Sequence, residues 1–96
     1  MQKLPKYFPF KVSGYYLYFT SHCILECMHV HASNEELTEG GSGKFFVKSD
    51  GSSVVVNKGH LNDREINAIQ KFISKNYEMM YATWRTISPK GYYEGQ

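Results

Sequence analysis

The spacing of hydrophobic residues changes near residue 60. Before it, short runs of aromatic and β-branched residues predict strands over 15–20, 28–32, 44–48 and 53–57. Asp50-Gly51 separates the last two runs, and it predicts a hairpin because glycine adopts the positive φ that a tight turn needs. A small antiparallel sheet of about four strands is therefore expected in the N-terminal part.

After residue 60 the apolar residues recur with helical spacing. Asn62 and Glu65 form the capping-box pattern that opens a helix, and Pro89 and Gly91 end it. One apolar stripe should be buried, formed by Ile66, Ile69, Ile73, Tyr77, Met80, Trp84 and Ile87. Because Asn76 is able to cap a second helix, we expect residues 63–87 to form one kinked helix or two helices, with the break or kink near residues 75–77.

The two halves together predict an α+β fold in which the sheet packs against a C-terminal helical segment. The chain of 96 residues is of the right size for a single domain over 1–96. Three segments lack a packing pattern. They are an extended lead-in over 1–9, a mobile, acidic, glycine-rich loop over 33–43 and a loose C-terminal tail over 90–96.

Charge and cysteine content narrow the class of protein. Eleven basic and nine acidic residues leave a net charge of +2, and the lysines are scattered. A nucleic-acid partner is thus allowed but not indicated, because phosphate binders usually concentrate basic charge on one face. No apolar run is long enough to span a bilayer or to act as a signal peptide, and Cys23 and Cys27 read as free thiols. We expect a protein of the bacterial cytoplasm with no membrane contact.

The sharpest chemical feature is His29-Val30-His31 on the second predicted strand. Residues i and i+2 of a strand share a face, so both imidazoles project to one side, opposite Met28, Val30 and Ala32. Two such rings can exchange protons, hold a metal or contact a phosphate. They are equally compatible with the solvated face of a half-buried strand. His29 and His31 are the candidate catalytic residues.

Cys23 and Cys27 add ligand types suited to tetrahedral zinc to the histidine pair. The spacing argues against such a site, because all four candidates fall within nine residues and structural zinc sites usually use two pairs far apart in the chain. No metal and no cofactor is expected. Cys27 as a nucleophile beside a histidine lacks a recognisable orienting carboxylate.

A second apolar line on the helical segment is formed by Ala68, Phe72 and Met79, well away from the main stripe. It is either buried inside a kinked helix or forms a face for a partner protein or for self-association. Tyr16 and Tyr18 share a face of the first strand and would border the histidines if the first two strands pair. Candidate binding residues are therefore Tyr16, Tyr18, Phe72 and Met79.

The order of these motifs resembles a family of small bacterial proteins known as domain of unknown function 4160. The resemblance covers roughly residues 8–88. It rests on the aromatic strand Gly14-Tyr15-Tyr16-Leu17-Tyr18-Phe19, the His-x-His pair, the hairpin, and a helical tail with Asn76-Tyr77 and Trp84. Many members are similar in having a proline-rich approach to the histidines, where this chain has 23–27 with its two cysteines.

The resemblance implies a role but gives no reaction. Genes of this family often lie beside a gene for a second small domain, an arrangement that resembles toxin–antitoxin pairs. We expect an interaction protein of a toxin–antitoxin-like or mobile-element module, with a partner on the helical face and the histidines lining a polar surface patch. The alternatives are a small histidine-dependent nuclease or phosphoryl-transfer enzyme, and an RNA-binding module that stacks bases on its tyrosines. Whether the chain is an enzyme is left open at this point.

Overall fold

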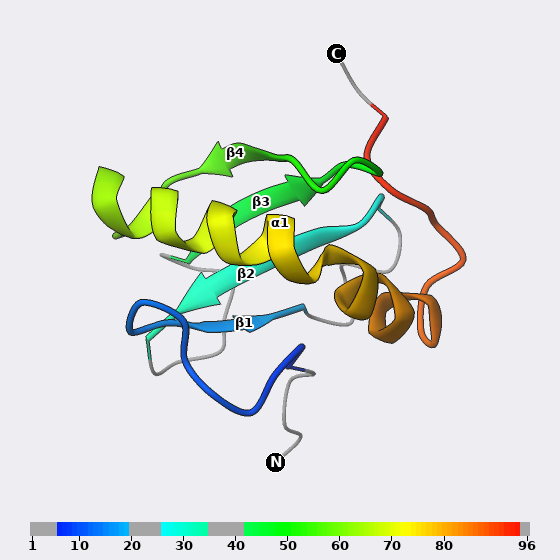
Figure 1. Ribbon diagram of the computed structural model, residues 1–96, viewed down its shortest axis with the longest axis horizontal. Coiled ribbons are helices and arrows are strands. Elements are labelled where there is room, and N and C mark those ends of the chain that lie inside the picture. Colours follow the sequence, from blue (N-terminus) through cyan, green and yellow to red (C-terminus); the bar gives the residue numbers. More distant parts are fainter. Residues whose placement is uncertain (1–5, 20–25, 35–41, 95–96) are drawn as a thin grey trace.

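The computed structural model describes residues 6–19, 26–34 and 42–94. Within them lie four strands and one helix, namely β1 (Tyr16–Tyr18), β2 (His29–Ser33), β3 (Gly43–Val47), β4 (Ser53–Asn57) and α1 (Asp63–Arg85). The strands pair antiparallel in the order β1-β2-β3-β4, and α1 crosses one face of the sheet (Figure 1). The predicted α+β fold is confirmed.

Strand register follows the alternation of side chains along β2. Val30 lies opposite Phe45 of β3, and His29 lies opposite Phe46. Met28, Val30 and Ala32 belong to the hydrophobic core together with Phe45 and the buried side of α1. The histidines therefore lie on the other face of β2 from Met28, Val30 and Ala32.

The β3–β4 hairpin forms where Asp50-Gly51 predicts it. The amide of Lys48 donates to the carbonyl of Ser52 (2.8 Å), and Gly51 has φ +90°. A Cβ atom at Gly51 would meet the ring of Tyr77 at 2.8 Å, so the turn needs glycine both for its backbone and for its contact with α1. The tip of the hairpin thus packs directly under the helix.

Helix α1 begins with the predicted capping box. Asn62 Oδ1 accepts from the amide of Glu65 (2.8 Å), and Glu65 Oε1 accepts from the amide of Asn62 (3.0 Å). Ile66, Ile69, Ile73, Met80 and Trp84 are buried, while Tyr77 is half-buried. Ile87 lies beyond the C-cap Thr86 and is 45% exposed, so its inclusion in the buried stripe was wrong.

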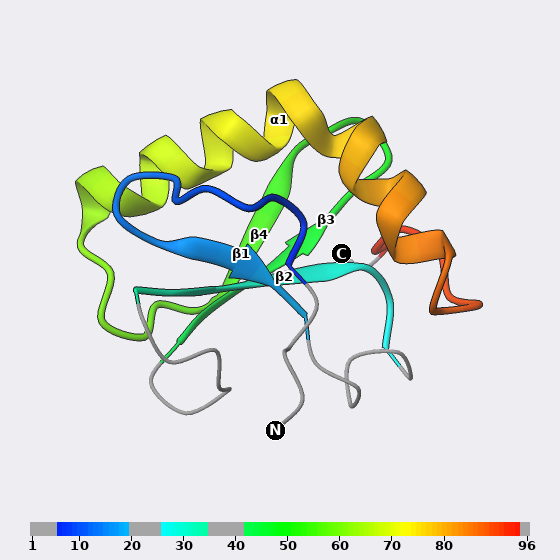
Figure 2. The ribbon, with the colours of Figure 1, turned by 90° about the horizontal axis from the view of Figure 1, so that it is seen from below.

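Of the two expected alternatives, the division into two helices does not occur: α1 is a single helix of 23 residues. Asn76 caps no second helix; its side-chain amide donates to the carbonyl of Phe72 one turn earlier (2.9 Å). Figure 2 shows that the helix axis curves over the sheet. A bent axis lets a long helix follow a small twisted sheet while it continues as one helix.

Both described ends of the chain are attached to the sheet. Lys6 forms a bridge to Tyr18, and the amide of Tyr7 donates to Leu17 (2.9 Å). Met28 donates to the carbonyl of Gly91 (2.9 Å), and Tyr93 donates to that of Val47 (2.8 Å). The loose tail expected over 90–96 is thus corrected for residues 90–94, which supply backbone partners to the ends of β2 and β3.

The loop expected over 33–43 is shorter at both ends, because Ser33 belongs to β2 and Gly43 to β3. Residues 35–41, on which the prediction of mobility falls, lie outside the described residues. Among the described residues, no helix has the length and apolar character needed to cross a membrane.

Candidate functional site

The two candidate catalytic histidines lie inside the protein. His29 is 1% exposed and His31 is 3% exposed, although both are on the face of β2 predicted to be solvated. Their rings are adjacent and nearly perpendicular, with centroids 5.2 Å apart and an interplanar angle of 86°. The expectation that they line a polar surface patch was therefore wrong, because the second face of β2 is buried as well.

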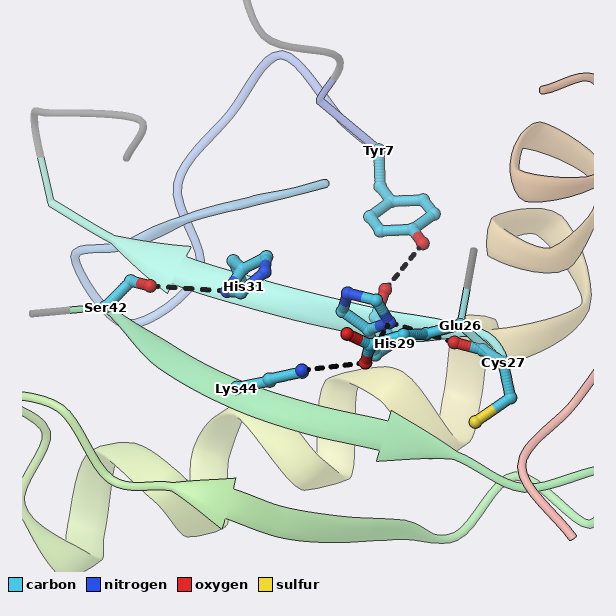
Figure 3. Close-up of polar contacts among 7 residues, drawn as sticks. All are labelled: Tyr7, Glu26, Cys27, His29, His31, Ser42 and Lys44. Atoms are coloured by element: carbon cyan, nitrogen blue, oxygen red, sulfur yellow. Dashed lines mark hydrogen bonds and ion pairs between the residues drawn. The ribbon is translucent and has the colours of Figure 1, made fainter. Parts of the chain in front are cut away.

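The His29 ring is fixed by its own strand and by aromatic neighbours. Its Nδ1 lies 2.8 Å from the carbonyl oxygen of Cys27, which can only accept, so Nδ1 carries a proton (Figure 3). The ring packs against Trp84 at 5.6 Å and Phe46 at 5.9 Å between centroids. The hydroxyl of Tyr7 donates to the His29 carbonyl (2.9 Å), so the N-terminal segment also holds this point of β2.

His31 is held from two other directions. Ser42, itself buried, places its Oγ 3.3 Å from Nδ1 of His31 (Figure 3). Tyr18 lies opposite His31 in the β1–β2 register, with its ring centroid 5.6 Å from that of the imidazole. The expectation that Tyr18 borders the histidines is correct, but its side chain is fully buried and offers no binding surface.

An ion pair lies next to the histidines at the protein surface. Lys44 Nζ is 2.8 Å from Glu26 Oε1, and the same carboxylate oxygen is 4.0 Å from Nδ1 of His29 (Figure 3). The pKa of Glu26 is lowered, first by the hydrogen bond from Lys44 and also by the positive charge of Lys44 and of the histidines, against an opposing effect of burial. Glu26 is therefore a carboxylate near neutral pH.

Sequence reasoning missed Glu26, Lys44 and Ser42. Lys44 and Ser42 reach the histidines only through the β2–β3 pairing, which the sequence does not fix. Glu26 precedes His29 by three residues, and this short separation was the one indication in the sequence that a carboxylate lies near the histidine. It supplies the carboxylate that sequence reasoning did not find near the histidines.

The zinc set is not assembled in the described residues. Cys23 lies outside them, and Cys27 is a half-buried free thiol whose pKa is raised chiefly by burial. It approaches His29 through its backbone carbonyl, while its sulfur points away from the imidazole ring (Figure 3). In the described part of the chain no three His, Cys, Asp or Glu residues are grouped so that they could hold a metal ion.

The remaining candidate binding residues lie elsewhere. Tyr16 is half-buried, and Lys6 Nζ lies 4.2 Å from its ring centroid, with Lys11 Nζ at 5.3 Å. Phe72 of α1 contacts Phe8 and Phe10 of the N-terminal segment edge to face, at 5.3 and 6.0 Å between centroids. Phe10 remains 49% exposed.

Met79 is 63% exposed on the same side of α1 as Phe72, two helical turns further on. We call the surface formed by Phe10, Phe72 and Met79 the apolar patch. Ala68, the third member of the predicted second line, is half-buried. The structure therefore covers part of that line with the N-terminal segment and leaves its far end exposed.

The site contains the parts for proton transfer, namely two imidazoles, a carboxylate and an ammonium group. General acid–base catalysis needs such a group within hydrogen-bond reach of the substrate. Only the charged pair meets solvent, since the side chain of Glu26 is 47% exposed and that of Lys44 is 22% exposed. In this conformation the imidazoles support the strand, and the ion pair is the part that a ligand can reach.

Comparison with known proteins supports the resemblance drawn from the motifs. Residues 14–85 match the family described as domain of unknown function (DUF4160), a range that contains β1 to β4 and all of α1. Searches of curated proteins and of solved structures each found no match. Since the matched range covers most of the 96 residues, the chain belongs to the DUF4160 family.

Proposed function

We propose that the protein is an interaction module of the bacterial cytoplasm that docks a partner protein on its apolar patch. The observation that carries the proposal is the exposure of Phe10, beside Phe72, and of Met79, two turns further along the same side of α1. Large apolar side chains grouped on a surface usually mark a site of protein contact. The family's paired-gene arrangement makes the product of the adjacent gene the first partner to test, as in a toxin–antitoxin-like or mobile-element module.

The way the patch is built supports docking. Phe72 is anchored in the helix and is contacted by Phe8 and Phe10, so an incoming side chain would meet an aromatic surface that is already ordered. Met79, two turns further along the same side of α1, offers a flexible, polarisable contact that adapts to the partner's shape. Binding on an ordered surface costs less conformational entropy than binding on a flexible one.

The histidines have a supporting role in this proposal. Their burial and their contacts with Cys27, Ser42 and Trp84 suit the packing of β2 better than they suit encounters with a substrate. No cofactor is required. Substitution of His29 or His31 should then affect stability more than it affects the contact with the partner.

The test is complex formation with the product of the adjacent gene, measured by size-exclusion chromatography with light scattering. Met79→Glu should abolish a stable complex, because a carboxylate would have to be buried in the interface. Val56→Glu is the matched control, since Val56 is 47% exposed on β4, away from the patch. A monomeric wild type that binds no such partner, or equal binding by both variants, would contradict the proposal.

A second candidate function is histidine-dependent phosphoryl transfer, favoured by the Glu26–Lys44 pair beside His29. It requires a movement that exposes the imidazoles to a phosphodiester. Cleavage of RNA or DNA by the wild type, lost in His29→Ala and His31→Ala, would establish it. Inactivity of the wild type on both, with and without divalent metal, would exclude it.

RNA binding through tyrosine stacking is less well supported. Tyr18 is fully buried, and Lys6 already occupies one face of the Tyr16 ring. If it occurs, binding of single-stranded RNA should weaken steeply with salt and depend on Tyr16.

A further inference from the structure

A groove of about 450 Å³ separates the start of β4 from the first half of α1. It is lined by Ser52, Ser53, Asn67, Gln70, Lys71 and Ser74. All six are polar, and Lys71 is the one charged residue among them. At 100° per residue, Asn67 and Ser74 lie about 140–160° around α1 from Phe72, and Lys71 lies about 100° from it. The groove is therefore separate from the apolar patch.

One wall of the groove is the outer edge of the sheet. Strand β4 is last in the strand order, and within the described residues no strand pairs with its far side. At the other end of the sheet, β1 is bridged by Lys6 and bonded by the Tyr7 amide. Strand β4, with the sequence Ser-Val-Val-Val-Asn, has no charge and no proline to block pairing. An open, β-branched edge of this kind is a template for another extended chain.

The backbone groups of β4 that face the groove can be identified. The Ser52 carbonyl accepts from the amide of Lys48, the residue after β3, so by alternation the amides and carbonyls of Ser53 and Val55 point away from β3. The carbonyl of Ser53 already accepts from the side-chain amide of Gln70 (3.0 Å). Helix α1 thus supplies one hydrogen bond that a neighbouring strand would make. Ser53 Oγ is buried with no hydrogen-bond partner in the described part of the chain.

Charge indicates which segment would fit. Lys71 supplies a positive charge to the helical wall of the groove. Asp50, in the turn that precedes β4, accepts from the amide and hydroxyl of Ser52 (2.9 and 2.6 Å), and its pKa is lowered by those two bonds. A carboxylate on an incoming chain is therefore favoured beside Lys71 and disfavoured near the hairpin tip.

We propose that an extended, acidic segment of another protein binds in this groove as an added strand on β4. Its main chain would pair with Ser53 and Val55, and an aspartate or glutamate side chain would lie beside Lys71. In strand addition the main-chain hydrogen bonds provide affinity and the flanking pockets provide selectivity. The site does not depend on the apolar patch, so either proposal can fail alone.

The experiment is a titration of the full-length ¹⁵N-labelled protein with a synthetic octapeptide. The probe alternates threonine and valine, carries two aspartates near one end, and is blocked at both termini. The expected result is saturable shifts of the Ser53 and Val55 amides and of the Gln70 side-chain amide. A version N-methylated at alternate residues should not bind, because it lacks the donors that an added strand needs.

Lys71→Glu should weaken binding about five-fold or more, as expected when a favourable surface ion pair becomes a repulsive one. Lys75→Glu is the matched control, because it makes the same charge change one turn along α1 and outside the groove lining. Absence of shifts at β4, equal binding of a peptide with lysines in place of the aspartates, or equal loss in the two variants would overturn the proposal. Pairing of β4 with a second copy, seen as a dimer without peptide, would also overturn it.

Discussion

The imidazole of His29 is fixed by the backbone of the same segment, since its Nδ1 lies 2.8 Å from the carbonyl oxygen of Cys27. That bond orients the ring toward Trp84 and Phe46 instead of toward solvent. A residue type that usually signals chemistry here has the surroundings of a packed core residue. If His29 is a packed core residue, its substitution should lower the free energy of unfolding.

His29→Ala should destabilise the fold by about 2–4 kcal/mol, through loss of a buried ring and of its hydrogen bond. Urea unfolding followed by circular dichroism measures the change. His60→Ala is the control, since His60 is exposed, and it should stay within about 0.5 kcal/mol of the wild type. An unchanged unfolding midpoint for His29→Ala would show that the ring contributes little to the fold.

The Glu26–Lys44 pair predicts a pH dependence of stability. Because the pKa of Glu26 is lowered in the folded state, its stabilising effect is present above the ordinary glutamate pKa and disappears as pH falls through the lowered value. The difference in unfolding free energy between wild type and Glu26→Gln should therefore shrink from pH 7 toward pH 3. It should be small throughout, since the side chain is 47% exposed.

Glu78→Gln, a change at an exposed carboxylate of α1, is the control for this pH series. A difference between wild type and Glu26→Gln that grows as the pH is lowered would contradict the assignment.

Gly14 and Gly51 have similar φ values, so comparing alanine variants at the two positions distinguishes backbone strain from a steric clash of the added Cβ. At Gly14 (φ +88°) an added Cβ would have no atom within 4 Å, whereas at Gly51 (φ +90°) it would meet the Tyr77 ring at 2.8 Å. Gly14→Ala should cost about 1 kcal/mol from the backbone alone, and Gly51→Ala clearly more. Thermal unfolding of the two variants tests the packing of the hairpin under α1. Equal losses of stability in the two variants would argue against that packing.

Asn62→Ala should cost about 1 kcal/mol, because the amide of Glu65 would lose its acceptor at the start of α1. Asn67→Ala, an exposed change one turn later, should not destabilise the helix. The thermal midpoints of the two variants provide the comparison. Equal midpoints would show that the helix start is held by packing alone.

Local signals predicted the strands, the hairpin and the capping box because each depends on residues close in the sequence. The burial of His29 depends instead on partners from distant segments, including Tyr7, Phe46 and Trp84. Period-two alternation says which side chains share a face, but it does not say whether that face is covered. The attachment of residues 90–94 was missed for the same reason, since Gly91 and Tyr93 bond to strands more than forty residues earlier in the chain.

The central claim is that a partner binds the apolar patch while the buried histidine strand stays closed. Methionine methyl signals report on both regions, because Met79 is 63% exposed and Met28 and Met80 are fully buried. With ¹³C-methyl methionine, addition of the adjacent gene's product should shift or broaden the Met79 signal and leave Met28 and Met80 in place. A shift of the methyl signal of Met28, which precedes His29 of β2, without a change in the Met79 signal would contradict the account.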